Sequence, residues 1–182
     1  MFIAVEGSDG TGKTTLCNIL TKCLGAISYS TPPKKYLKLR SEVDKDTTIN
    51  ESYKFYRDGI YDASNEIEAL LNSGNTVVCD RYWLSTYSSH QVMGVSVSML
   101  DFQSIVFPTL TVILSVNHQV QVERMIKRGM SVNDRRLLNK QRDIATAFYN
   151  NALELNMPFI LIDTQHFLPE ECAEIVIKAL KL

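Results

Sequence analysis

The eight residues from Gly7 to Thr14 constrain the fold of this chain more than any other segment. They read GSDGTGKT, which fits the pattern G-x-x-x-x-G-K-[ST], and they lie between an apolar run at 2–6 and a helical pattern that starts at Lys13. Glycines in such a turn let backbone amides surround phosphate oxygens, and the N-terminus of the next helix adds partial positive charge. The pattern therefore predicts a strand, a phosphate-binding loop (P-loop) and a helix in direct succession.

Two side chains of this loop predict its chemistry. Lys13 is expected to reach the β- and γ-phosphates of a nucleotide, and the Thr14 hydroxyl is expected to ligate Mg²⁺. The remaining residues expected to bind the donor nucleotide are Gly7, Ser8, Asp9, Gly10, Thr11, Gly12 and Thr15.

Strand and helix patterns alternate along the chain. The apolar runs that predict strands lie at 2–6, 27–30, 76–79, 109–116 and 158–162. The helical patterns lie at 13–24, 50–71, 83–107 (irregular), 119–128, 134–155 and 169–180, and a loop is expected after Pro32-Pro33. Strands that are apolar throughout indicate a parallel sheet with helices on both faces. The predicted fold class is α/β, a P-loop NTPase fold with a five-stranded parallel sheet.

Length and composition exclude several classes of protein. With 182 residues the chain predicts one domain over 1–182. Hydrophobic residues at 45% and charged residues at 21% exclude a disordered or coiled-coil protein, and the apolar runs are too short to span a bilayer. Four cysteines without a C-x-x-C pair argue against a zinc site, and no signal-peptide pattern precedes the first strand. We expect a reduced, cytoplasmic protein.

A basic segment stands out from the net charge of −1. Between positions 122 and 142 two acidic residues accompany seven basic ones: Arg124, Lys127, Arg128, Arg135, Arg136, Lys140 and Arg142. One basic segment on a neutral chain suits a small polyanion better than a nucleic acid. We expect an arginine-bearing lid at about 124–142, with a solvated helix face as the alternative.

The tripeptide Asp80-Arg81-Tyr82 follows the strand predicted at 76–79. In a doubly wound sheet this position lies beside the phosphate loop. The Asp80 carboxylate can hold a metal-bound water or orient an acceptor, and Arg81 can bridge two phosphoryl groups. The alternative is an ordinary salt bridge at a strand end.

These motifs together resemble the thymidylate kinase family of nucleoside monophosphate kinases. The segments that carry the resemblance are VEGSDGTGKTT at 5–15, Asp80-Arg81-Tyr82 with Ser85, and Arg128-Gly129 with Asp134-Arg135. The resemblance covers nearly the whole chain. It implies Mg²⁺-dependent transfer of the γ-phosphoryl group of ATP to a nucleoside monophosphate, dTMP before any other.

The resemblance also implies roles for single residues. Asp9 contacts the acceptor sugar, and Arg81 holds the acceptor phosphate near the γ-phosphate. Gly10 stands where some members of the family carry a catalytic arginine, so that task passes to the lid. The implied catalytic residues are Lys13, Asp80, Arg81, Arg128 and Arg135 (or Arg136). Arg124 joins the donor site, Tyr82 and Ser85 join the acceptor site, and Asp80 joins Thr14 at the metal.

Two departures from the family concern the acceptor base. Phe55 is followed four residues later by Gly59 where an arginine is usual, and Thr31-Pro32-Pro33 replaces the segment T-R-E-P-G. The chain is more similar here to the branch that includes mitochondrial UMP-CMP kinase 2. In that reading Arg40 binds the acceptor phosphate and Phe55 stacks on the base. The candidates for reading the base edge are Arg57, Ser88, His90 and Gln91.

Several alternatives stay open at this point. The acceptor can be UMP or CMP, or their deoxy forms. A deoxynucleoside kinase would use Asp80 as the base for a sugar hydroxyl, although the basic lid and Arg40 disfavour an uncharged acceptor. A third alternative is an ATP-binding protein without turnover. The expected partners are nucleotides, with no nucleic acid and no membrane, and relatives of this kind often form homodimers through helices beside the sheet.

Overall fold

The computed structural model describes residues 1–180, apart from the side chains of Val132 and Asn133. The strands are β1 (Phe2–Gly7), β2 (Ile27–Ser30), β3 (Val77–Asp80), β4 (Leu110–Ser115) and β5 (Phe159–Asp163). The α-helices are α1 (Lys13–Cys23), α2 (Leu37–Asp46), α3 (Ile49–Asn72), α4 (Trp83–Val92), α5 (His118–Arg128), α6 (Val132–Leu137), α7 (Gln141–Glu154) and α8 (Pro169–Ala179). Short 3₁₀ turns lie at Lys34–Tyr36, Met99–Phe102 and Leu138–Lys140.

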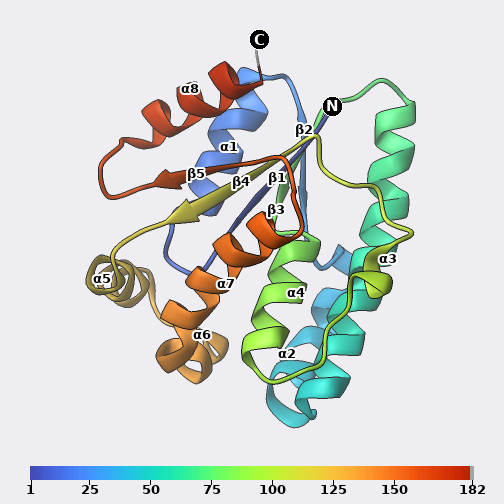
Figure 1. Ribbon diagram of the computed structural model, residues 1–182, viewed down its shortest axis with the longest axis vertical. Coiled ribbons are helices and arrows are strands. Elements are labelled where there is room, and N and C mark those ends of the chain that lie inside the picture. Colours follow the sequence, from blue (N-terminus) through green and yellow to red (C-terminus); the bar gives the residue numbers. More distant parts are fainter. Residues whose placement is uncertain (181–182) are drawn as a thin grey trace.

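All five strands are parallel and lie in the order β2-β3-β1-β4-β5 (Figure 1). The first strand is therefore central, and the loop that follows it emerges between β3 and β4. In the β1–β3 ladder Val5 lies opposite Asp80, so the end of β3 comes out beside the phosphate loop. The predicted five-stranded parallel sheet is confirmed.

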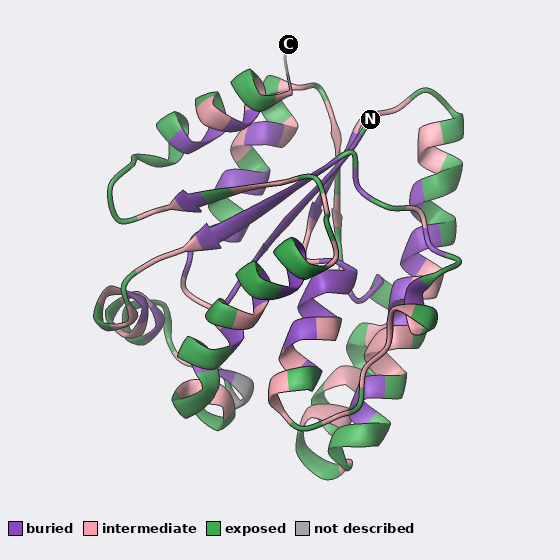
Figure 2. Cartoon of the chain, viewed as in Figure 1, coloured by how far each residue is buried: buried purple, intermediate pink, exposed green. Residues whose placement is uncertain are grey.

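Helices cover both faces of the sheet (Figure 1). On one face α3, α4 and α7 bury Ile67, Leu84 and Phe148 against the strands, and on the other face α1 packs beside α8 through residues such as Leu16 and Val176. Figure 2 shows the central strands almost wholly buried between these two layers. Burial on both faces explains why the strands are apolar throughout instead of alternating.

The largest helix has a clear local start signal. Thr48 and Glu51 form a capping box at the N-terminus of α3, in which the Thr48 hydroxyl accepts from the Glu51 amide and the Glu51 carboxylate accepts from the Thr48 amide. Two of the amides that a helix leaves unpaired at its start are satisfied in this way. The helix begins within one residue of the start predicted at position 50.

Three sequence expectations differ from the structure. The segment after Pro33, expected as a loop, contains α2; none of its ten described residues is buried, so it lacks the apolar periodicity that marks a helix. The single helix expected at 134–155 is divided into α6 and α7 by the turn Leu138–Lys140. The irregular helical stretch expected at 83–107 is helical only to Val92, with one later 3₁₀ turn.

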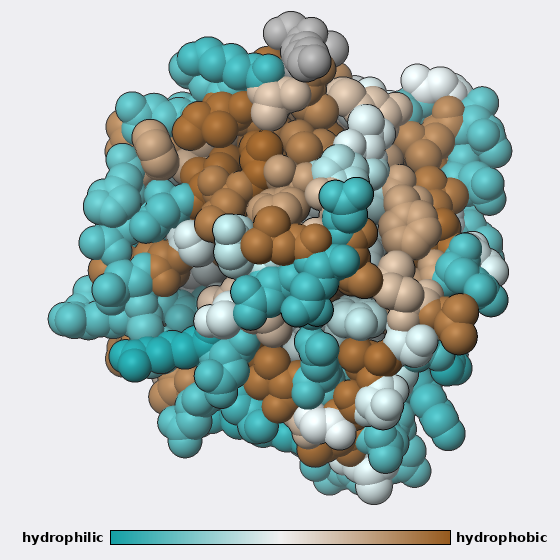
Figure 3. Space-filling view, viewed as in Figure 1, coloured by the Kyte–Doolittle hydropathy of each residue, from teal (hydrophilic) through white to brown (hydrophobic). Residues whose placement is uncertain are grey.

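The surface separates a polar part from an apolar one. Figure 3 shows hydrophilic side chains over α5 and α6, and hydrophobic side chains gathered between α7 and α8 along the β5 edge. In β5 the Leu161 side chain is 48% exposed. Within residues 1–180 no helix has both the length and the apolar character that a membrane crossing requires.

The core on the α7 side yields a stability prediction. We expect Phe148→Ala to lower the free energy of unfolding by about 3–5 kcal/mol, because it leaves a cavity under a helix that packs on β1 and β4. Tyr149→Ala, at the neighbouring exposed position, should cost less than about 1 kcal/mol. Urea unfolding followed by circular dichroism measures both; equal losses would contradict the described packing.

Candidate active site

The phosphate loop joins β1 to α1 in a turn that exposes the helix N-terminus. Gly12 is the N-cap of α1 and has φ +94°, a left-handed conformation that a residue with a side chain adopts at a cost. No side chain caps the helix, so its first amides remain free to bind an anion. The sequence motif is thus built as an anion-binding turn with the helix dipole behind it.

Lys13 is buried inside this turn, with 6% of its surface exposed. Its Nζ donates to the Ser8 carbonyl at 2.6 Å, and the Thr11 hydroxyl donates to the same carbonyl at 2.9 Å. Burial and the nearby Arg81 cation lower the pKa of Lys13 to about 8, although Asp9 and Asp80 oppose this. Because Thr11 also satisfies the carbonyl, Lys13 can move to a phosphate without leaving an unpaired buried oxygen.

Thr14 and Asp80 form the pair predicted to hold the metal. The Thr14 hydroxyl donates to Oδ2 of Asp80 at 2.6 Å, joining the first turn of α1 to the end of β3. Mg²⁺ prefers oxygen ligands and binds through one or two protein oxygens together with phosphates and waters. A hydroxyl and a carboxylate side by side at the phosphate loop fit that preference.

Arg81 is the central cation of the site. Its guanidinium forms an ion pair with Asp9 and donates to the Gly7 carbonyl at 3.0 Å and to the Ser85 hydroxyl at 3.3 Å. The backbone of Arg81 has φ +66°, a conformation unusual for a residue with a side chain and frequent at functional sites. Burial favours a neutral Asp9, but the cations Arg81, Lys13 and Arg128 prevail and lower the pKa of Asp9 to about 2.

Glu6 is a buried acid beside the site, to which the sequence reasoning gave no role. Its side chain is fully buried and accepts from the Tyr82 amide at 3.0 Å, from the Ser85 amide at 3.4 Å and from the Ser85 hydroxyl. Burial raises the pKa of Glu6 to about 7, with Ser85 and Arg81 opposing the shift. The signal was a carboxylate near the end of an otherwise apolar strand, which indicates a buried acid with dedicated partners.

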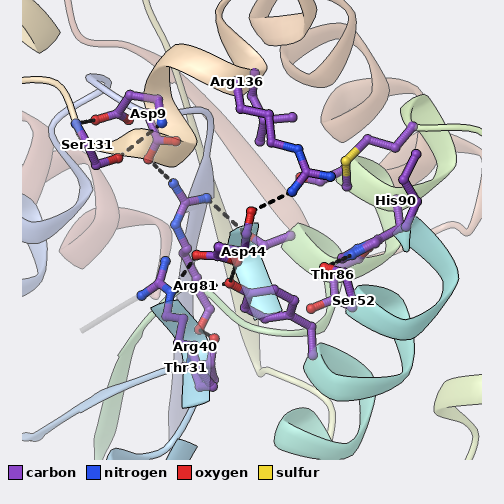
Figure 4. Close-up of a pocket in the computed structure, with 18 of the residues that line it drawn as sticks. Asp9, Thr31, Arg40, Asp44, Ser52, Arg81, Thr86, His90, Ser131 and Arg136 are labelled. Atoms are coloured by element: carbon purple, nitrogen blue, oxygen red, sulfur yellow. Dashed lines mark hydrogen bonds and ion pairs between the residues drawn. The ribbon is translucent and has the colours of Figure 1, made fainter. Parts of the chain in front are cut away.

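A cavity of about 380 Å³ opens next to Arg81 (Figure 4). Figure 4 shows Asp9 on one side of Arg81 and the group of Ser52, Thr86 and His90 on the other. The predicted site residues that line it are Asp9, Arg40, Arg81, Ser85 and Arg128. Its size falls in the range of small-molecule sites.

The structure distinguishes between the arginines of the lid segment. Arg128 lines the cavity, donates to Asp134 at 2.8 Å and lies 4.0 Å from the Asp9 carboxylate. Arg136 lines it as well, whereas Arg135 is outside its lining. The Arg124 side chain is not part of the cavity lining; it donates to the hydroxyl and the carbonyl of Thr164, the residue that follows β5. The structure thus brings Arg136, and not Arg135, to the cavity with Arg128.

Two acceptor-site predictions do not match the cavity. Phe55 is absent from its lining and instead packs edge-on against Tyr36 and Tyr56; it is Tyr56 that lines the cavity. Tyr82 is fully buried, and its hydroxyl donates to the Val106 carbonyl. The Tyr82 side chain therefore lies away from the cavity, because the chain turns at Arg81 and sends Tyr82 into the core.

Four residues were candidates for reading the edge of the acceptor base. Of these four, His90 is the one found in the cavity lining that the structure describes. Its Nδ1 lies 2.8 Å from the Thr86 carbonyl and its Nε2 lies 3.4 Å from the Ser52 hydroxyl. A carbonyl can only accept, so Nδ1 carries the proton and Nε2 is an acceptor. Burial lowers the pKa of His90, which favours this neutral form.

The other three base-edge candidates have partners away from the cavity. Arg57 pairs with Asp58, and Ser88 and Gln91 both accept from the Asn151 amide. Sequence reasoning also missed Asp44 of α2, which lines the cavity and accepts from the Tyr56 hydroxyl at 2.6 Å. It lay in a segment expected to be a loop, so nothing in the sequence pointed to it.

We predict that burial of the Lys13 ammonium lowers the stability of the fold, although the same group is needed for ligand binding. Its folded-state pKa of about 8 lies below the ordinary value of 10.5, so the unfolded chain binds more protons between these pH values and wild-type stability rises with pH there. At pH 7 we expect Lys13→Met to be more stable than the wild type by on the order of 1 kcal/mol, a difference that shrinks towards pH 10, and to lose ATP binding.

Urea unfolding at pH 7 and pH 9.5, with calorimetric titration of ATP, measures both effects. Lys22→Met, at an exposed position of the same helix, serves as the control and should change stability by less than about 0.5 kcal/mol. A Lys13→Met chain that is less stable than the wild type at pH 7 would contradict the described burial.

Comparisons with known proteins agree on one family. A family model described as thymidylate kinase matches residues 5–175. A probable thymidylate kinase of Archaeoglobus fulgidus is 29% identical over 185 residues, which cover 96% of this chain and 92% of that protein. A thymidylate kinase of Buchnera aphidicola is 32% identical over 149 residues, covering 70% of each.

The fold comparison agrees as well. The crystal structure of a thymidylate kinase from Ehrlichia chaffeensis matches with a TM-score of 0.76, covering 99% of this chain and 98% of that one at 21% identity. At that identity the match establishes the fold, and the family model supplies the family. The chain therefore belongs to the thymidylate kinase family and is a phosphotransferase of the nucleoside monophosphate kinase class.

Proposed function

We propose that this chain transfers the γ-phosphoryl group of ATP, with Mg²⁺, to a pyrimidine nucleoside monophosphate, and that dTMP is its main acceptor. The observation that carries the proposal is the position of Arg81. Its guanidinium contacts the Gly7 carbonyl of the phosphate loop and also lines the 380 Å³ cavity. One fixed cation thus borders both the donor phosphates and the space for an acceptor, as an in-line transfer requires.

The residues of the donor side bind and neutralise the phosphates. The free amides at the N-terminus of α1 and the Lys13 ammonium hold the β- and γ-phosphates, and Thr14 and Asp80 hold Mg²⁺. A metal ion held by these two residues would offset the negative charge of the phosphates. Arg128 and Arg136 approach from the lid segment, where they add positive charge as the acceptor enters.

The opposite part of the cavity suits a nucleoside monophosphate acceptor. Arg40 lies beside Tyr56, whose hydroxyl accepts from the Arg40 Nε at 3.2 Å, so a cation and an aromatic ring stand together. We assign Arg40 to the acceptor phosphate, Asp9 to the sugar and the Tyr56 ring to the base. The Nε2 of His90, which lies 3.4 Å from the Ser52 hydroxyl, can accept from a base N–H group when that hydroxyl turns away.

The lining also bears on the alternative acceptors. Four arginines line the described cavity, Arg40, Arg81, Arg128 and Arg136, against the three aspartates Asp9, Asp44 and Asp134. The surplus of positive charge suits a phosphate-bearing acceptor better than an uncharged deoxynucleoside. At the base end the described lining residues include Ser52, Thr86 and His90, with no arginine from α3. Because hydroxyls and an imidazole would read the base edge, UMP, CMP and their deoxy forms remain the second candidates for the acceptor.

A coupled assay of ADP release tests the acceptor. With ATP and Mg²⁺ we expect turnover of dTMP at a kcat/KM at least about tenfold above that of dUMP, UMP, CMP, dCMP, AMP, GMP and the free deoxynucleosides. Turnover led by UMP or CMP would replace the acceptor with the second candidate. ATP binding without turnover of any acceptor would overturn the proposal in favour of a silent ATP-binding protein.

Arg81→Lys tests the central cation. Lysine keeps the positive charge but loses the planar pair of donors, so we expect kcat to fall by about 100-fold or more with the thermal midpoint nearly unchanged. Arg142→Lys, an exposed position outside the cavity lining, is the matched control and should keep wild-type turnover. Equal kcat values in the two variants would remove Arg81 from the site.

A further inference from the structure

The phosphate loop is held from outside by two buried glutamines that the function proposed above does not use. Gln121 of α5 is 3% exposed, and Gln141, the first residue of α7, is 1% exposed. The first lies one turn before the lid segment of 124–142, and the second lies at its other end. The Nε2 of Gln121 donates to the Oε1 of Gln141 at 3.2 Å, so this glutamine pair joins the two ends of the lid segment.

The side chains of both glutamines also form hydrogen bonds with the main chain of Asp9. Gln121 Nε2 donates to the Asp9 carbonyl at 2.6 Å and to the Ser8 hydroxyl at 2.9 Å. The Asp9 amide in turn donates to Gln141 Oε1 at 3.4 Å. The amide and the carbonyl of this one loop residue are therefore both paired with the lid ends.

The backbone of Gly10 shows how tightly α5 approaches the loop. Gly10 has φ +79°, and a Cβ at this position would lie 2.9 Å from the Gln121 carbonyl oxygen and 3.0 Å from the Met125 side chain. The loop therefore packs directly on α5 with no room for a side chain at Gly10, and we expect a shift of α5 at Gln121 to move the loop. Loss of the Gln121 amide would leave buried polar groups without partners.

The side chain of Asp9 extends the connection into the site. Its carboxylate pairs with Arg81 and lies 4.0 Å from Arg128, which belongs to the lid segment. Asp9 is thus bound to the lid ends by its main chain and to Arg81 by its side chain. A change in the separation of the lid ends alters the position of Asp9, and through it that of Arg81.

We propose that Gln121 is a positioning residue. Together with Gln141 it holds the phosphate loop in a fixed position relative to the two ends of the lid segment. It touches neither donor nor acceptor; it acts through Asp9 and Arg81. The inference rests on the proposed phosphoryl transfer for its kinetic test, and it has a second test that needs no turnover.

The kinetic test compares two glutamines of the same helix. Gln121→Met keeps the length of the side chain and removes its hydrogen bonds, and Gln119→Met makes the same change at an exposed position. We expect Gln121→Met to lower kcat at least about tenfold, because Arg81 is misplaced, while the KM for ATP changes less than about threefold. Gln119→Met should match the wild type.

A double-mutant cycle tests the pairing. Because the two amides act in one network, Gln121→Met combined with Gln141→Met should lower kcat little further than Gln121→Met alone. Losses of kcat that multiply would overturn the proposal, since they would mean that the two residues act independently. So would a Gln121→Met kcat equal to that of Gln119→Met.

The second test measures the lid segment directly. Arg135 and Arg136 are exposed tryptic sites inside it. With the lid ends no longer joined, we expect trypsin to cut the Gln121→Met chain here about fivefold faster than Gln119→Met, at a temperature well below both thermal midpoints, so that cleavage reports the lid segment and not global unfolding. Equal cleavage rates would overturn the proposal. If the wild type phosphorylates no nucleoside monophosphate, the proposed function fails and this test alone decides the role of Gln121.

Discussion

The contact between Arg81 and Asp9 is the interaction on which the rest of the site depends. It exists because β3 pairs in parallel with the central β1, which brings Val5 opposite Asp80 and places Arg81 under the phosphate loop. Two carboxylates then hold the chain on either side of this point. Glu6 accepts from the Tyr82 amide and the Ser85 hydroxyl, and Asp9 pairs with the Arg81 guanidinium. The acids compensate for the charge of a half-buried guanidinium, whose partial loss of water would otherwise be costly.

The sequence was sufficient for the fold and for the form of the phosphate loop because those features depend on local patterns. The turn from Gly7 to Thr14 needs its glycines and its lysine in one continuous stretch, and apolar strands signal burial wherever they pack. The sheet and the family are confirmed. The roles assigned to Lys13, Arg81 and Arg128 stay predictions, although the structure gathers all three around one cavity or its adjoining loop.

The acceptor side was harder because it is assembled from helices that touch only in three dimensions. Phe55 and Tyr56 are neighbours in the sequence, and the rotation of α3 alone decides which of them lines the cavity. The same holds for Arg135 and Arg136 in α6. Helix α2, which contributes Arg40 and Asp44, has no fully buried residue, and so no hydrophobic pattern marks it in the sequence. The closer likeness to the branch of mitochondrial UMP-CMP kinase 2 stays a prediction.

The resting position of Lys13 has a thermodynamic consequence. The ammonium is already bound to the Ser8 carbonyl, so in its proposed role a phosphate has to compete with a ligand supplied by the chain itself. With a pKa of about 8, part of the free protein holds a neutral amine in mildly alkaline solution, whereas the proposed contact with phosphate requires the charged form. With Lys13 in this role we expect nucleotide binding near pH 8 to take up protons, so that its calorimetric heat includes the ionisation heat of the buffer.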